Sequence, residues 1–291
     1  MIQDYSKSSA KWVPIKPGEY LYGVHIKDEK SKERLDTHLY KPITIKSILL
    51  GKTIVLDPGH GGRTSGAVNS KLGIIEKYAN NTLTRKIADK LTEAGAKVVF
   101  TRKPEKDIYV SLEDRANIAN NAKADLFISI HHDGNANKNV SGISTHYSTY
   151  RPGIDTSNTY VMYKGKRYQY VREIKNWDGI TSAIVYLDEG KEVTRSMDDL
   201  KVYDNETPTL EAIESNKFAE YLFDSIYSLG FSTSSYKRDG NFYVTRWTNM
   251  PSVLLEAGYI SNDTEALRVT DPVFEMKIAE KVVQAIIKFF M

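Results

Sequence analysis

The sequence contains no cysteine among its 291 residues. This absence excludes disulfide bonds, metal sites built from thiolates and cysteine nucleophiles together. Any metal must therefore be held by histidine and carboxylate side chains. The nucleophile of any hydrolytic reaction must be water or a hydroxyl group.

A strong excess of charge of one sign is also missing. Lys and Arg total 40 against 37 Asp and Glu, which leaves a formal net charge of +3. This balance is too weak to indicate a nucleic-acid partner, although it is compatible with an anionic substrate. A hydrophobic fraction of 41% and a charged fraction of 26% are typical of a soluble globular protein with one large domain and room for appendages.

The start of the sequence lacks a long apolar run. Its first residues, MIQDYSKSSAK, predict neither a signal peptide nor a transmembrane anchor. Residues 1–50 are expected to form an appendage, in which EYLYGVHI and YKPITIKSI predict short strands joined by an exposed charged turn. His25 and His38 lie in this segment without convergent partners, so we interpret them as surface or hydrogen-bonded histidines.

Residues 51–291 show an alternation of strands and helices. The apolar run TIVL predicts a buried strand, apolar residues at every fourth position predict a helix between Ile75 and Gly95, and the next strand follows at 96–102. Ser111 begins a capping box for a second helix, after which DLFISIHH reads as a third strand. Short links between these elements imply parallel crossovers, so the fold class is α/β with helices on both faces of the sheet.

Two histidines follow strands that end at the same edge of this sheet. His60 comes after the Pro-Gly turn that stops the first strand, and His131 ends the third strand. Glu76 stands at the first turn of the intervening helix, after a Gly-rich loop that folds back over the strand ends. Two imidazoles and one carboxylate are the ligand set of a catalytic zinc site with a fourth position open.

His132 and His146 are alternatives for the second imidazole. Adjacent strand residues point to opposite faces of a sheet, so His131 and His132 cannot both face the same metal.

A further carboxylate ends a distant apolar strand. Glu256 follows Val253-Leu254-Leu255 and precedes Ala257-Gly258. Burying a carboxylate at the end of an apolar strand costs free energy of folding, so such a residue is usually paired or functional. Close to the predicted metal it would serve as general base toward water and then as proton donor to a departing amine, with Asp133 as the next candidate for the base. Alternatively, it caps the helix that begins near residues 262–265.

Four motifs, namely IVLDPGHGG, the downstream Glu76, SLEDRANIANNAKADLFISIHHDG and MPSVLLEAGYISN, resemble those of the type 3 zinc-dependent N-acetylmuramoyl-L-alanine amidases. The resemblance covers nearly all of residues 51–291. Among the relatives, the sequence resembles the cell-wall amidases of Gram-positive bacteria. It implies a parallel-rich sheet of about six strands, Zn²⁺ bound by His60, Glu76 and His131, and Glu256 as the catalytic glutamate. The implied substrate is the amide between muramic acid and L-alanine in peptidoglycan, which places the activity outside the cell at the wall.

The chain departs from this family in two places. His132 and Asp133 follow the ligand histidine where the family has a small residue and then Asn. Residues 151–206 form an insertion in which VMYKGKRYQYV and AIVYLDEGKEV each predict two strands about a Gly-containing turn. We expect a small β element near the rim of the site, whose tyrosines fill a minor core or stack on sugar.

Two other functions use the same residues. A catalytically silent, or partner-activated, peptidoglycan-binding module would keep the fold without turnover, and a zinc peptidase would cut within the stem peptide instead. The sequence identifies no activating protein partner.

Overall fold

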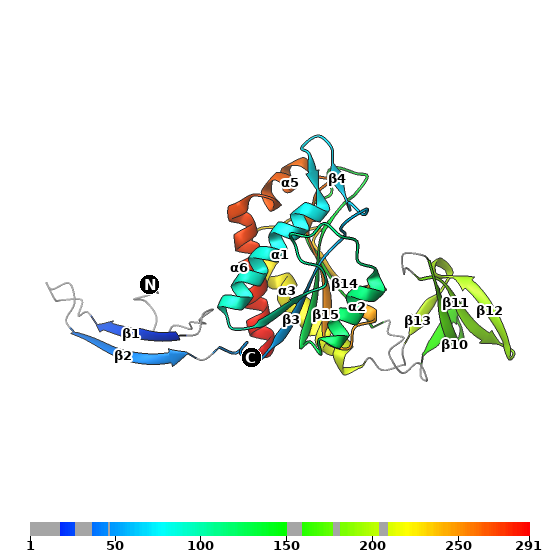
Figure 1. Cartoon of the computed structure of the whole chain (residues 1–291), viewed down its shortest axis with the longest axis horizontal. Helices are drawn as coiled ribbons and strands as arrows, with labels where there is room; N and C mark the ends of the chain where they lie inside the picture. Colours follow the sequence, from blue (N-terminus) through cyan, green and yellow to red (C-terminus); the bar gives the residue numbers. More distant parts are fainter. Residues whose placement is uncertain (1–17, 27–36, 46, 150–158, 177–180, 204–208) are drawn as a thin grey trace.

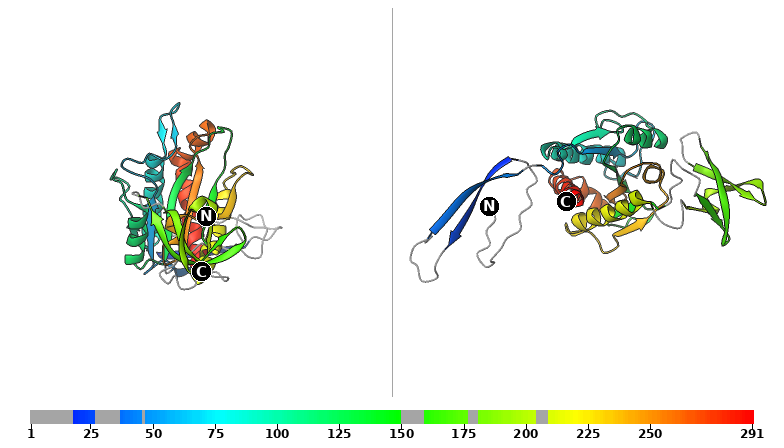
Figure 2. Two further views of the ribbon diagram at one scale, coloured as in Figure 1. Left: turned by 90° about the vertical axis from the view of Figure 1, so that its right-hand side faces the viewer. Right: turned by 90° about the horizontal axis from the view of Figure 1, so that it is seen from below.

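The computed structural model describes residues 18–26, 37–45, 47–149, 159–176, 181–203 and 209–291. A six-stranded sheet with its helices forms the centre of the molecule. Figures 1 and 2 show a two-stranded hairpin and a separate five-stranded sheet at opposite ends of this central part.

The central sheet has the strand order β14-β8-β15-β7-β3-β6. Its strands are β3 (Thr53–Pro58), β6 (Lys97–Phe100), β7 (Leu126–Asp133), β8 (Ser144–Tyr147), β14 (Tyr236–Asp239) and β15 (Ser252–Tyr259). The four strands β6, β3, β7 and β15 are parallel, which confirms the predicted α/β class. β8 is antiparallel to β15 and β14 is parallel to β8, so these two strands run in the opposite direction, which the sequence did not indicate.

Helices cover both faces of the sheet. α1 (Glu76–Glu93), α3 (Leu210–Tyr227) and α6 (Pro272–Phe290) pack on one face, and α2 (Leu112–Asn121) and the short α4 (Tyr243–Arg246) pack on the other. Alternation along β3 divides the core, because Ile54 and Leu56 join the cluster under α1 while Val55 joins the cluster under α2. α5 (Asp263–Val269) follows β15.

Local sequence signals account for the ends and the buried faces of these helices. The predicted stripe on α1 is buried at Ala79, Leu83, Ile87 and Leu91. The Ser111 side chain caps α2 by accepting a hydrogen bond from the backbone N–H of Asp114.

The five-stranded sheet lies within the predicted insertion. It consists of β9 (Tyr160–Tyr163), β10 (Lys166–Lys175), β11 (Thr181–Asp188), β12 (Lys191–Ser196) and β13 (Lys201–Tyr203), with a short 3-10 helix, η1 (Met197–Asp199), before the last strand. The two predicted hairpins are present, and each turns at a residue pair with positive φ, Lys164-Gly165 and Glu189-Gly190. Tyr170 and Tyr186 are buried in the core of this sheet, as the minor-core interpretation expects.

The N-terminal hairpin pairs β1 (Gly18–Ile26) with β2 (Thr37–Ile45) in antiparallel register. Both predicted strands are therefore present, while the charged turn at 27–36 lies outside the described residues. The register places the backbone of His25 opposite that of His38. β1 and β2 form a sheet of their own and add no strand to the central sheet.

Candidate active site

Three segments meet at the carboxyl ends of the central parallel strands. His60 follows β3, His131 lies near the end of β7, and Glu76 is the first residue of α1. The loop before α1 contains the small hairpin of β4 (Val68–Asn69) and β5 (Ile74–Ile75). The backbone N–H of Glu76 donates to Ala67 O, so this loop returns the chain to the sheet at the point where α1 begins.

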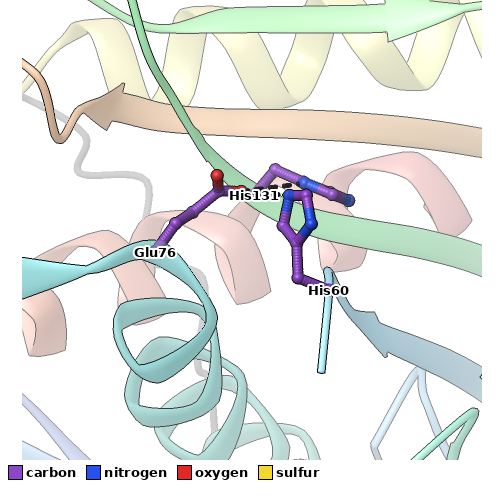
Figure 3. A group of neighbouring side chains, drawn as sticks. All are labelled: His60, Glu76 and His131. Carbon is purple, nitrogen blue, oxygen red and sulfur yellow. Dashed lines mark hydrogen bonds and ion pairs between the residues drawn. The ribbon is translucent and has the colours of Figure 1, made fainter. Parts of the chain in front are cut away.

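The side chains of His60, Glu76 and His131 point toward one another (Figure 3). One carboxylate oxygen, Glu76 Oε1, lies 3.0 Å from His60 Nε2 and 3.0 Å from His131 Nδ1. One donor atom from each residue falls within 4.8 Å of the other two. Among the residues that the structure describes, this is the one group of three or more His, Cys, Asp or Glu side chains able to hold a metal ion.

The carboxylate of Glu76 is buried and fully engaged. Its Oε2 accepts a hydrogen bond from the backbone N–H of Ala67, and its Oε1 accepts one from Asn80 Nδ2. Burial acts to raise the pKa of Glu76, but hydrogen bonds from His131 and His60 outweigh it and hold the pKa below its ordinary value. Glu76 is therefore an anion facing two imidazoles.

Glycines leave the space that these side chains need. A Cβ at Gly59 would lie 2.3 Å from His131 Cε1, and one at Gly66 would lie 2.3 Å from Glu76 Oε2. Two nitrogen donors and one oxygen donor suit a borderline-soft divalent ion such as Zn²⁺. The side chains of His60 and His131 are 29% and 19% exposed, so a bound ion would keep a coordination position open to solvent.

Glu256 faces the same region from β15. The register pairs Glu256 with His131 on the neighbouring parallel strand, so both side chains lie on the same face of the sheet. Glu256 Oε2 is shielded from solvent and has no hydrogen-bond partner among the described residues. Burial, together with the negative charges of Glu76 and Asp133, raises the pKa of Glu256 well above its ordinary value. The alternative role as a helix cap falls to Asn262, whose side chain accepts from Glu265 N.

A cavity of about 560 Å³ opens over these groups. Its lining includes the three residues of the cluster, Glu256, and the segment from His132 to Ala136 with Lys138. Asp133, the next candidate for a base, therefore also lies at the site.

The two alternative histidines are not part of the cluster of His60, Glu76 and His131, although His132 also lines the cavity. His132 points to the opposite face from His131, where its Nδ1 donates to Asn80 Oδ1 over 2.8 Å, and burial lowers its pKa to about 4. His146 contacts Ser144 Oγ over 2.9 Å, and burial together with Arg238 lowers its pKa to about 4. Neither belongs to the metal-binding group.

Asn80 was not identified from the sequence as a residue of the site. It hydrogen-bonds both Glu76 and His132 and so joins α1 to the end of β7. Its position four residues after Glu76 on one helix face was the available signal.

The described residues of the insertion do not line this cavity. β8 is antiparallel to β15, with Ser144 opposite Glu256 and His146 opposite Leu254. The chain therefore leaves β8 toward the end of the sheet opposite to the one that carries Glu256. No residue of 159–176 or 181–203 lines the cavity, so the expected position at the rim of the site is wrong for the described part of the insertion.

A family model and two curated relatives that match this chain are all described as amidases. A family model described as N-acetylmuramoyl-L-alanine amidase matches residues 54–288. The chain is 25% identical over 246 residues to the N-acetylmuramoyl-L-alanine amidase LytC of Bacillus subtilis, covering 84% of this chain and 37% of LytC. It is 30% identical over 243 residues to the probable cell wall amidase LytH of Staphylococcus epidermidis, covering 83% of this chain and 60% of LytH. It thus spans roughly one third to three fifths of the length of these curated relatives.

Solved structures with the same fold include an N-acetylmuramoyl-L-alanine amidase from Clostridium difficile, with a TM-score of 0.57 and 25% identity over 82% of this chain and 96% of the other. The catalytic domain of the amidase CwlV from Bacillus (Paenibacillus) polymyxa matches with a TM-score of 0.54 and 25% identity, covering 82% and 97%. In the part of the chain that the structure describes, no helix is long and apolar enough to cross a membrane. Because the family model matches most of its length, this chain belongs to the N-acetylmuramoyl-L-alanine amidase family.

Proposed function

We propose that this chain is a zinc-dependent amidase that hydrolyses the bond between N-acetylmuramic acid and L-alanine in peptidoglycan. The observation that carries the proposal is the convergence of His60, Glu76 and His131 with Glu256 at one end of the sheet. The names of the relatives LytC and LytH agree with this activity and with action at the cell wall.

His60, Glu76 and His131 would be the metal ligands in this proposal. Zn²⁺ held by them would act as a Lewis acid that polarises the amide carbonyl and lowers the pKa of water. Glu76 supplies one negative charge against a divalent ion, so a net positive charge would remain to stabilise an oxyanion. The second carboxylate oxygen of Glu76 is held by Ala67 N–H, which fixes the orientation of the ligand.

Glu256 would be the proton-transfer group. Its Oε2 has no partner among the described residues, and its shielded environment favours the protonated form. The raised pKa of Glu256 lies closer to neutral pH than that of an ordinary carboxyl group. A group with such a pKa can both accept a proton from the attacking water and return it to the departing amine. The sequence has no cysteine nucleophile, and water is the nucleophile that we propose for these groups to activate.

Analysis of digested muropeptides by mass spectrometry tests this function. An amidase releases intact stem peptides beginning with L-alanine and glycan strands with free lactyl groups. A peptidase acting on the stem peptide instead leaves peptide stubs on the glycan, and a silent module binds the material without changing its mass. Digestion with the purified chain alone also tests whether an activating partner is required.

A further inference from the structure

Two buried arginines converge on the backbone of a proposed metal ligand. Arg102 Nε and Arg115 Nη2 each donate to the carbonyl oxygen of His60, both over 2.7 Å. Arg102 Nη2 also donates to Gly59 O over 2.9 Å, and Arg115 Nη1 to Pro58 O over 2.8 Å. The two guanidinium groups therefore hold three consecutive carbonyls where the chain leaves β3.

The held backbone has an unusual conformation. His60 has φ of 60°, in the left-handed region that non-glycine residues rarely adopt, and Gly61 follows with φ of 125°. A Cβ at Gly61 would lie 2.7 Å from Arg102 Nε, so glycine is required for the arginine to approach. Because φ sets the direction of the Cα–Cβ bond, relaxation of this turn would swing the His60 imidazole away from Glu76.

The arginines are themselves fixed in place. Arg102 and Arg115 are only 2% and 3% exposed. Asp57, at the end of β3, accepts from Arg115 Nη1 over 2.6 Å and from Ser129 Oγ over 2.6 Å. This links β3, β7 and α2 to the same turn. Burial and the neighbouring Arg115 lower the pKa of Arg102 to about 10, so its guanidinium group stays charged at neutral pH.

We infer that Arg102 and Arg115 are positioning residues that hold His60 in its metal-binding orientation by fixing its backbone carbonyl. The inference rests on the proposed metal centre. It differs from the usual support of a ligand histidine, in which a hydrogen bond to the second ring nitrogen sets the orientation of the imidazole.

Arg102→Lys and Arg115→Lys test this role. Lysine keeps the positive charge, but its single ammonium group does not reproduce the planar fork that bonds two carbonyls at once. Arg268→Lys is the matched control, because Arg268 donates to the backbone carbonyls of Leu229 and Gly230 and does not line the site. The Kd for Zn²⁺ is measured by competition with a chromophoric chelator, and hydrogen exchange of residues 59–64 is measured on the metal-free protein.

Both site variants are expected to weaken zinc binding by about tenfold to a hundredfold, as loss of ligand-supporting groups does. They should also speed amide exchange in residues 59–64, while Arg268→Lys changes neither property. An unchanged Kd in folded Arg102→Lys protein overturns the inference, even if exchange is faster. Should Arg115→Lys fail to fold, Arg102→Lys decides, because it keeps the Asp57–Arg115 pair. If the wild-type chain binds no zinc, the proposed metal centre is wrong. Unchanged amide exchange in the variants would separately refute the inference that Arg102 and Arg115 fix the backbone of this turn.

Discussion

At the scale of single residues, Glu76 is the centre of the site. Its Oε1 is 3.0 Å from a nitrogen of each imidazole, so this one oxygen contacts both of the other proposed ligands. Asn80 and Ala67 N–H hold the carboxylate from behind. These hydrogen bonds fix the orientation of the Glu76 carboxylate toward the two imidazoles.

Replacing any one proposed ligand should remove the metal. His60→Ala, Glu76→Ala and His131→Ala each leave two protein ligands, and three are the usual minimum for a zinc site that keeps an open position. Elemental analysis of the purified variants measures the loss, with His146→Gln as a control outside the cluster. Stoichiometric zinc in the His131→Ala protein would contradict the assignment.

Glu256→Gln should keep the fold and the zinc but lose turnover. The amide preserves shape while removing the proton acceptor, and general acid–base help is worth about 10²–10⁴-fold in rate. Muropeptide release, bound zinc and the unfolding midpoint are measured on one preparation. A merely structural Glu256 predicts the opposite result, with lower stability and near-normal activity per folded molecule, and an active variant would direct attention to Asp133.

The raised pKa of Glu256 also predicts a pH dependence of stability for the metal-free protein. Between the ordinary value of 4.5 and the raised value in the fold, the folded state holds a proton that the unfolded state has released. The stabilising contribution is therefore present below 4.5 and is lost as pH rises through the folded pKa. Urea unfolding across this window should show a decline in wild type that Glu256→Gln lacks; parallel profiles would contradict it.

At the scale of elements, a buried ion pair joins the insertion to the central part of the molecule. Arg246 on α4 lies 2.8 Å from Glu173 on β10, and each side chain is only 2% exposed. Thr181 Oγ1 donates to Glu173 Oε2 over 2.6 Å. Lys175 adds a hydrogen bond to the Tyr243 hydroxyl over 2.7 Å. The five-stranded sheet is therefore packed against α4 through specific polar contacts at the base of β10 and β11.

Breaking one side of this pair should be costly. Glu173→Ala leaves the Arg246 charge buried without its partner, and such losses cost about 3–5 kcal/mol. The double variant Glu173→Met with Arg246→Met removes both charges and should recover much of the stability. Urea unfolding of the two variants measures the difference. Equal stability of Glu173→Ala and wild type would show that the pair contributes nothing.

At the scale of the whole molecule, the proposed catalytic site and the five-stranded sheet belong to separate parts of the fold. The five-stranded sheet contributes no strand to the central sheet and has its own buried core. Its described residues do not line the cavity over the proposed metal site. This arrangement therefore argues against direct contact between the described part of the insertion and a substrate bound in the cavity.

Replacing residues 151–206 by a short Gly/Ser linker should leave a folded domain that binds zinc. The five-stranded sheet has its own buried core and adds no strand to the central sheet, so the central core keeps its strands and helices without it. Cooperative thermal unfolding and zinc content are the measurements, and the full chain is the control. Loss of cooperative unfolding in the deletion variant would mean that the insertion is part of the central fold.

The local pattern of the sequence was enough to predict the α/β class, the helix between Ile75 and Gly95 and the helix that Ser111 caps. Strand and helix periods depend on near neighbours, so the stripe on α1 and the opposite directions of His131 and His132 follow from spacing alone. Because parallel strands end at one edge of the sheet, the sequence predicts that His60 and His131 lie together, and their donor atoms and that of Glu76 do lie within 4.8 Å of one another.

Other features were decided only by the tertiary structure. Whether a strand enters a sheet parallel or antiparallel depends on where its connection runs in space, so the reversed direction of β8 and the resulting position of the insertion were not visible in the sequence. The contacts of Arg102 and Arg115 with His60 span 42 and 55 residues. No local period encodes such contacts, because they arise when the strands and α2 pack together around one turn.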